Sequence, residues 1–368
     1  MFDNTERQGL CFRALSCKMK SEILERGRKP VELQKRRPTG RVAMMAAVLL
    51  ALFLLSFIWG RYDVPLPEVV RILLSRLLPV THTWTDNMAI AVCNVRLPRI
   101  LLACLVGCAL SAAGASYQTV FQNPMAAPDI LGASSGACFG AALAILTGQS
   151  SVTVTVYAFC ASLLSVALVY LVGSRTRGSR VVNLLLAGIM VGSLFTAGTS
   201  YIKLVADPTN QLPQITYWLM GSLSGTRMKT VGFAAVCMAV GLLPLLLLRW
   251  RMNLLTLSAD EARAMGIHTD RLRLAVILSA TVLTASAVSV SGMIGWVGLV
   301  IPHLSRRIVG NDCRWLLPMS MLFGAAFLLL VDNMARCLTA VEIPIGILTA
   351  FVGAPFFLYL MIKGGERA

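Results

Sequence analysis

Long uncharged stretches are the feature that most constrains how this chain can fold. Eight runs contain no Asp, Glu, Lys or Arg: Val42–Gly60, Ile100–Phe121, Ile130–Ser174, Val181–Ile202, Val231–Leu248, Leu274–Ser305, Trp315–Val331 and Ile343–Ile362. About twenty apolar residues cross a bilayer as a helix, in which every backbone amide bonds within its own segment. The sequence therefore predicts an all-α polytopic membrane protein.

Two of the runs are long enough to hold two helices each. Ile130–Ser174 contains the polar turn Thr147–Ser151, and Leu274–Ser305 contains Ser291-Gly292. Dividing both gives about ten transmembrane helices in one membrane domain, residues 42–368. Only 14% of residues are charged, against about a quarter in soluble domains, and the intervening loops are too short for a soluble catalytic domain.

The net charge of +16 would fit a nucleic-acid-binding protein, but the placement of the charge favours a membrane. With ten helices and an internal N-terminus, the basic clusters between later helices fall on the cytoplasmic side, as membrane proteins require. Both termini are therefore expected to be cytoplasmic. Eight basic residues are exceptions on the outer side: Arg61, Arg71, Arg76, Arg96, Arg99, Arg227, Lys229 and Arg336.

Residues 1–41 form a basic segment with no apolar core of a secretory signal. We expect a disordered cytoplasmic tail that contacts anionic membrane lipid. A start codon assigned too far upstream is the alternative.

The sequence offers little catalytic chemistry. His82, His268 and His303 are scattered, so no metal site is expected, and no P-loop or paired catalytic side chains occur. Asp332 is the one carboxylate clearly inside a predicted helix, which weakens an ion-gradient-driven carrier. Arg336 follows it by four residues, so an intrahelical ion pair is one interpretation of both. Five of the ten cysteines lie inside the apolar runs, namely Cys104, Cys108, Cys138, Cys160 and Cys237, where a free thiol behaves as a small apolar group. Cys93 and Cys337 both fall on the predicted outer side, and a disulfide between them is the alternative to free thiols.

The stretch from Arg96 to Gly136 points to a transport path. Its apolar run breaks at Gln122-Asn123-Pro124, Asp129 ends the break, and Gly132 and Gly136 then open the next apolar run with Gly140 at the same spacing. Small residues on one face let helices approach closely, and lining of the path is the alternative.

Three further segments are candidates for functional parts of the protein. Asp207–Gly221 is an interfacial belt or a short helix of an outer vestibule. Trp250–Arg273 is predicted to contain a short helix, because Ser258, Glu261 and Gly266 stand at capping positions. This helix is either part of an ordinary loop or a docking helix for a cytoplasmic partner. Gly295–His303 is a glycine- and proline-broken helix of the kind that lines cavities.

Several blocks, in order along the chain, resemble one family. They are RLPR at Arg96–Arg99, NPMAAPDILGASSG at Asn123–Gly136, LLLAG at Leu184–Gly188, YWLMGSL at Tyr217–Leu223, the Leu257–Ile267 loop, GLVIPH at Gly298–His303 and EIPIGILTAFVGAPFFLYLM at Glu342–Met361. The chain is similar to FecCD permeases, the membrane subunits of ABC importers for iron-siderophore complexes, haem and vitamin B12. The resemblance runs from about Asp63 to the C-terminus.

The resemblance implies a fold like that of the vitamin B12 importer permease, a homodimer, two cytoplasmic ABC ATPase subunits and an extracytoplasmic substrate-binding protein. It implies that Arg96, Arg99 and Arg336 dock the binding protein, and that a gate or pathway includes Asn123, Pro124, Met125, Gly132 and Gly136. It places the ATPase-coupling loop at Leu257, Ser258, Ala259, Asp260, Glu261, Ala262, Arg263, Met265 and Gly266. Met293 and Trp296 depart from the usual smaller or other apolar residues.

The expected function is that of a permease subunit, not itself an enzyme and with no cofactor, that moves a metal chelate across the cytoplasmic membrane with ATP hydrolysed by partners. An iron(III)-siderophore is the first choice of cargo on frequency. Haem or vitamin B12 is the alternative within the class. An ion-gradient-driven secondary carrier is the alternative from another class.

Overall fold

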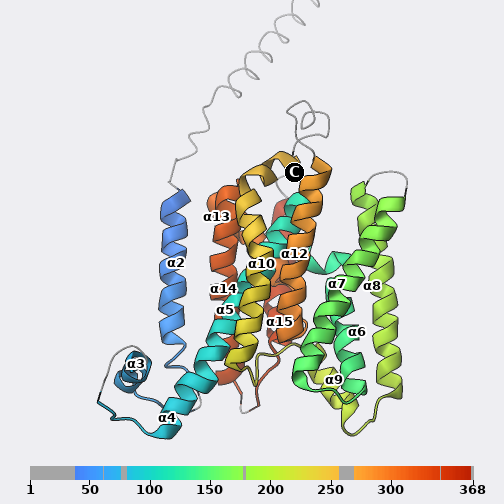
Figure 1. Cartoon of the computed structure of the whole chain (residues 1–368). Helices are drawn as coiled ribbons and strands as arrows, with labels where there is room; N and C mark the ends of the chain where they lie inside the picture. Colours follow the sequence, from blue (N-terminus) through green and yellow to red (C-terminus); the bar gives the residue numbers. More distant parts are fainter. Residues whose placement is uncertain are drawn as a thin grey trace, which may run out of the picture. The chain divides into compact units, whose positions relative to one another are not determined.

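A computed structural model describes residues 38–60, 62–75, 81–176, 180–256, 269–339 and 341–365, and its regular elements there are all helical (Figure 1). They are α2 Pro38–Leu55, α3 Leu66–Leu74, α4 Asp86–Ile90, η1 Ala91–Arg96, α5 Leu97–Val120, η2 Pro128–Leu131, α6 Ala133–Leu146, α7 Ser151–Arg175, α8 Arg180–Val205, α9 Gln211–Leu219, α10 Met228–Met252, η3 Asn253–Thr256, α12 Thr269–Ser291, α13 Val297–Val309, α14 Cys313–Cys337 and α15 Ile345–Gly365. Residues Arg41–Ala368 form one compact unit.

The predicted helical membrane fold is confirmed. In the described part of the chain, seven helical segments are long and apolar enough to span a membrane: α2, the continuous Asp86–Val120 segment, α7, α8, α10 with η3, α12 and α14. The two predicted divisions also occur, between α6 and α7 and between α12 and α13. Because α6 has 14 residues and α13 has 13, both shorter than a bilayer crossing, the count of ten spans stays a prediction.

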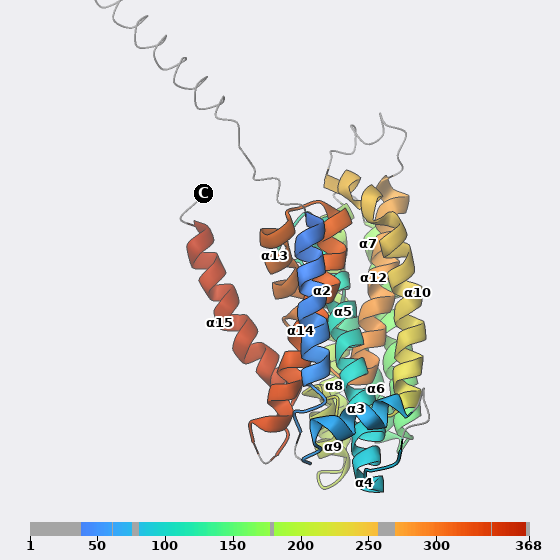
Figure 2. The ribbon, with the colours of Figure 1, turned by 90° about the vertical axis from the view of Figure 1, so that its left-hand side faces the viewer.

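Helix α5 is the centre of the packing. It contacts α10, α12, α13 and α14, while α6, α7 and α8 contact one another and join the rest mainly through α12 (Figure 1). Helix α15 contacts α13 and α14 and diverges from them towards its C-terminal end (Figure 2). The group α6–α9 and helix α15 therefore leave faces that no other described helix covers.

Glycines set how closely α5 meets its neighbours. A Cβ on Gly114 would lie 1.8 Å from the carbonyl oxygen of Gly298 on α13, and one on Gly107 would lie 2.2 Å from that of Gly324 on α14. In lipid the helices gain little from hydrophobic burial, so such close backbone contact is a main source of association.

Gly114→Ala should therefore destabilise the bundle, since the new methyl group overlaps backbone that has no rotamer to change. Overpacking of this kind costs about 1–3 kcal/mol, which should lower the thermal midpoint of the purified protein in detergent. Gly232→Ala in α10 is the matched control: its Cβ would meet nothing within 4 Å, and the midpoint should stay or rise slightly. Equal midpoints for both variants would contradict the packing argument.

Candidate functional site

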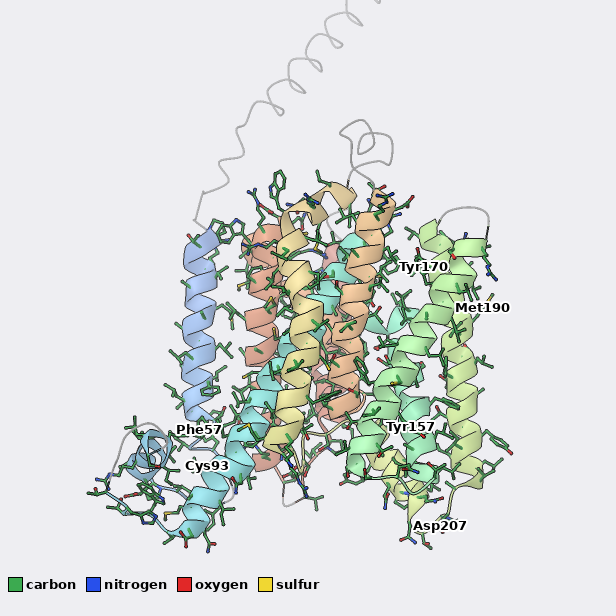
Figure 3. All side chains as sticks on the ribbon, viewed as in Figure 1. Phe57, Cys93, Tyr157, Tyr170, Met190 and Asp207 are labelled. Carbon is green, nitrogen blue, oxygen red and sulfur yellow. The ribbon has the colours of Figure 1, made fainter. Side chains whose placement is uncertain are left out.

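The three arginines predicted to dock a partner lie in three helical elements at one end of the bundle. Arg96 ends η1, Arg99 begins α5, and Arg336 lies in the last turn of α14. Arg96 donates to the backbone carbonyls of Phe57 and Tyr62, and Phe57 marks this end of the bundle in Figure 3. The fold thus brings together residues that are 240 positions apart in the sequence.

Two carboxylates pair with the guanidinium groups of Arg99 and Arg336. Arg99 Nε is 2.9 Å from Asp332 Oδ1, and its Nη1 contacts both carboxylate oxygens of Glu342, at 3.0 and 2.9 Å. Arg336 Nε is 3.3 Å from Asp332 Oδ2, and Arg336 also donates to Asn333. The intrahelical pair expected from the spacing of Asp332 and Arg336 is confirmed.

Burial makes this ion cluster a structural element. The side chain of Asp332 is 0% exposed, those of Arg99 and Arg336 are 7% and 8% exposed, and that of Glu342 is 34% exposed. Removing one partner of a buried pair leaves an uncompensated charge, which is strongly destabilising. Since Glu342 lies just before α15, the cluster ties that helix to α5 and α14.

Cys93 and Cys337 are both free thiols, so the disulfide considered from the sequence is not formed.

The predicted gate segment is a turn at the other end of α5. Asn123, Pro124 and Met125 are exposed, and the Asn123 side chain accepts a hydrogen bond from the Met125 amide at 2.9 Å. Gln122, just before it, has a φ of +49°, a conformation that residues other than glycine seldom adopt. Such a conformation persists only where the surroundings hold it.

Side-chain bonds of two glutamines supply that support. Gln122 donates to the carbonyl of Leu255 in η3, at 2.5 Å. One turn earlier, Gln118 donates to the Leu299 carbonyl in α13 at 3.1 Å and accepts from Arg306 at 2.6 Å. The gate turn is therefore bound to both α13 and the segment that leads out of α10.

The predicted ATPase-coupling loop, from Leu257 to Ile267, lies outside the described residues. The element before it, η3, is held by hydrogen bonds to the start of α14. The Asn253 amide donates to Asp312 Oδ1 at 2.8 Å and accepts from the Cys313 amide at the beginning of α14. Burial alone would raise the pKa of Asp312, but hydrogen bonds from the Arg314 amide and Asn253, with the charge of Arg314, hold it below its usual value. This cap therefore stabilises the fold at neutral pH and is lost as the pH falls through the lowered pKa.

Two grooves border the faces that other helices leave uncovered. The first, of about 520 Å³, runs along small residues of α8 from Gly188 to Ser200. The second, of about 740 Å³, lies between the end of α9, the α12–α13 link and α15; Met293 and Trp296 line it. Asp129 borders both grooves.

The predicted pathway glycines take different places. Gly132, at φ +72°, turns the chain from η2 into α6. Gly136 is buried, and a Cβ there would lie 2.6 Å from the Ala161 carbonyl oxygen in α7, as expected for helix packing. The groove residue Asp129 was not predicted, although it is the one charged residue between Arg99 and Arg175 in the sequence.

Comparison with known proteins gives the class to which this arrangement belongs. Residues 48–363 match the FecCD transport family, so the chain belongs to that family. It is 39% identical to a "Probable iron chelatin transport system permease protein" of Helicobacter pylori, over 87% of this chain and 96% of that one. It is 40% identical to the "Molybdate import system permease protein MolB" of Haemophilus influenzae, over 83% and 91%.

A solved metal-chelate type ABC transporter in an inward-facing conformation superposes with a TM-score of 0.79 at 38% identity, covering 88% of this chain and 99% of that chain. The chain is therefore a multi-pass permease of a metal-chelate type ABC importer, a class that works with separate ATPase subunits and a binding protein.

Asp332→Asn should test whether the ion cluster supports the fold. The variant keeps the shape of the side chain but leaves Arg99 and Arg336 short of a negative charge, a loss of about 3 kcal/mol. The thermal midpoint in detergent should fall by many degrees. Glu68→Gln, which removes the exposed pair of Glu68 with Arg71, should change it little. A midpoint for Asp332→Asn as high as that of Glu68→Gln would contradict the structural role.

Proposed function

We propose that two copies of this chain form a homodimer that carries an iron(III)-siderophore, whole, into the cytoplasm. The observation that carries the proposal is the second groove, whose lining is mostly apolar, including Leu219, Met220, Ile347 and Phe351. A path for a bare metal ion would need a series of oxygen or nitrogen ligands, whereas a chelate presents its organic shell. Haem and cobalamin, for which related permeases are named, are the alternative cargoes.

The arginine cluster is the proposed docking region for acidic side chains of the binding protein. The two guanidinium groups of Arg99 and Arg336 pair with the two carboxylates of Asp332 and Glu342 and balance them in charge. Arg96, which donates to the backbone carbonyls of Phe57 and Tyr62, adds a positive charge that has no carboxylate within 4 Å among the described residues. Glu342, the most exposed member, accepts from the single nitrogen Nη1 of Arg99 with both of its carboxylate oxygens, a contact that a partner's carboxylate would replace. An incoming carboxylate would compete with Glu342 and so act on the start of α15.

The coupling loop, Leu257–Gly266, is the proposed contact with the ATPase. Its support is its sequence pattern together with the anchoring of η3, the element immediately before it. The Gln122–Leu255 bond gives motion at that loop a direct mechanical link to the gate turn Asn123–Met125. In this orientation the N- and C-termini face the cytoplasm, and the basic segment 1–41 contacts anionic lipid. Family membership gives no support to the ion-gradient-driven carrier considered as an alternative.

Deleting Ala259–Gly266 should abolish ATP-driven uptake in liposomes that contain the permease, its ATPase and its binding protein. The deletion removes the proposed ATPase contact but no described helix, so the protein should still insert and elute as a folded species. Uptake at an unchanged rate would contradict the proposed coupling. A variant that fails to fold would be replaced by Glu261→Arg, which is expected to lower the ATPase stimulation by the loaded binding protein.

Gln122→Glu should weaken coupling, because a carboxylate of the same shape cannot donate to the Leu255 carbonyl. One such bond is worth about 1 kcal/mol, or about fivefold in the balance of gate states. We expect about fivefold less uptake per ATP hydrolysed, and Gln122→Arg, which retains a donor, should restore most of it. Asn183→Ala is the control, since it loses an equivalent amide-to-carbonyl bond to Thr176 away from the gate turn. A coupling ratio equal in Gln122→Glu and Asn183→Ala would contradict the link.

A further inference from the structure

Asp129 lies about halfway along the length of the helix bundle. The residues next to it, in η2 and at the start of α6, pack against glycines of α8. A Cβ added to Gly188 would lie 2.1 Å from the Ile130 carbonyl oxygen, and a Cβ added to Gly192 would lie 3.7 Å from the Gly132 Cα. These glycines are well inside the 26-residue helix α8, far from either end. The carboxylate therefore lies within the membrane-spanning part of the protein.

Asp129 borders both grooves and is exposed as a residue. Its carboxylate accepts a hydrogen bond from Ser134 and forms no ion pair with any cation in the described ranges. Asp332 in α14 is by contrast fully buried between two arginines. The two acidic groups are therefore arranged for different tasks.

A charged group inside a membrane is costly unless it faces water, a cavity or a partner. Asp129 is on the rim of both grooves, one along α8 and the other beside α15. An ionised carboxylate at this rim fits a hydrated passage better than a lipid-facing surface, and from there its charge acts on both grooves.

The surroundings indicate what that charge would recognise. The second groove combines a largely apolar wall with the indole of Trp296, whose ring centroid is 6.3 Å from that of Phe357 on α15. A carboxylate and an aromatic ring beside an apolar surface suit an organic group that carries a positive charge or several hydrogen-bond donors. An anionic group would meet repulsion at the same point.

We propose that Asp129 is the charge-selecting residue of the passage, favouring a chelate with a cationic or donor-rich outer surface over an anionic one. The proposal rests on the transport function above and deepens it by naming the class of cargo.

The test measures the electrostatic potential in the groove without knowledge of the cargo. Ser193 on α8 borders the first groove together with Asp129. In the assembled transporter, with the ten native cysteines replaced, Ser193→Cys would be labelled with methanethiosulfonates bearing either an ammonium or a sulfonate group. The ratio of the two rates reports the local charge.

We expect the ammonium reagent to react faster, and Asp129→Asn to lower the rate ratio at least about fivefold. Asp129→Glu should retain the ratio. Asp207→Asn, which removes a half-buried carboxylate in the α8–α9 loop, should leave it unchanged. A ratio that does not respond to Asp129→Asn, or a cysteine that neither reagent reaches, would overturn the proposal. Failure of the proposed function would be distinguishable, since it would appear as a lack of ATP-driven uptake by the unmodified transporter.

Discussion

The way charge is accommodated inside an apolar bundle is the constraint on which the rest of this structure depends. Each ionised group among membrane helices must find an opposite charge, a set of hydrogen bonds or water. At one end of α5 that requirement produces the cluster of Arg99, Asp332, Arg336 and Glu342. Asp129 meets the same requirement differently, by facing two grooves. Paired charges hold the helices, and the exposed charge marks where the protein is hydrated.

Helix α5 connects these parts. Its start carries Arg99, its middle meets α13 and α14 through Gly114 and Gly107, and its end carries Gln118 next to the gate turn. Because glycine contacts leave no side chain to adjust, the middle of the helix is a rigid part of the bundle. The turn after it carries the unusual backbone conformation of Gln122, which the hydrogen bonds to α13 and η3 hold in place.

The helices could be predicted from the sequence because hydropathy directly reflects the bilayer, and the break after Phe121 was visible as a polar, proline-containing interruption. The Asp332–Arg336 pair followed from four-residue spacing. Glu342 and Gln122 could not be assigned their partners, because Arg99 and Glu342 are 243 residues apart and Gln122 and Leu255 are 133 apart. Asp129 was visible as an isolated charge, but its place beside both grooves depends on how α8 and α15 pack.

Uptake into liposomes measures whether this chain is a passage whose energy comes from other proteins. Purified chain alone, given a proton or sodium gradient, would be compared with the complete assembly of permease, ATPase, loaded binding protein and ATP. We expect ferric chelate to accumulate only in the liposomes that contain the complete assembly. Uphill accumulation by the chain alone would contradict it.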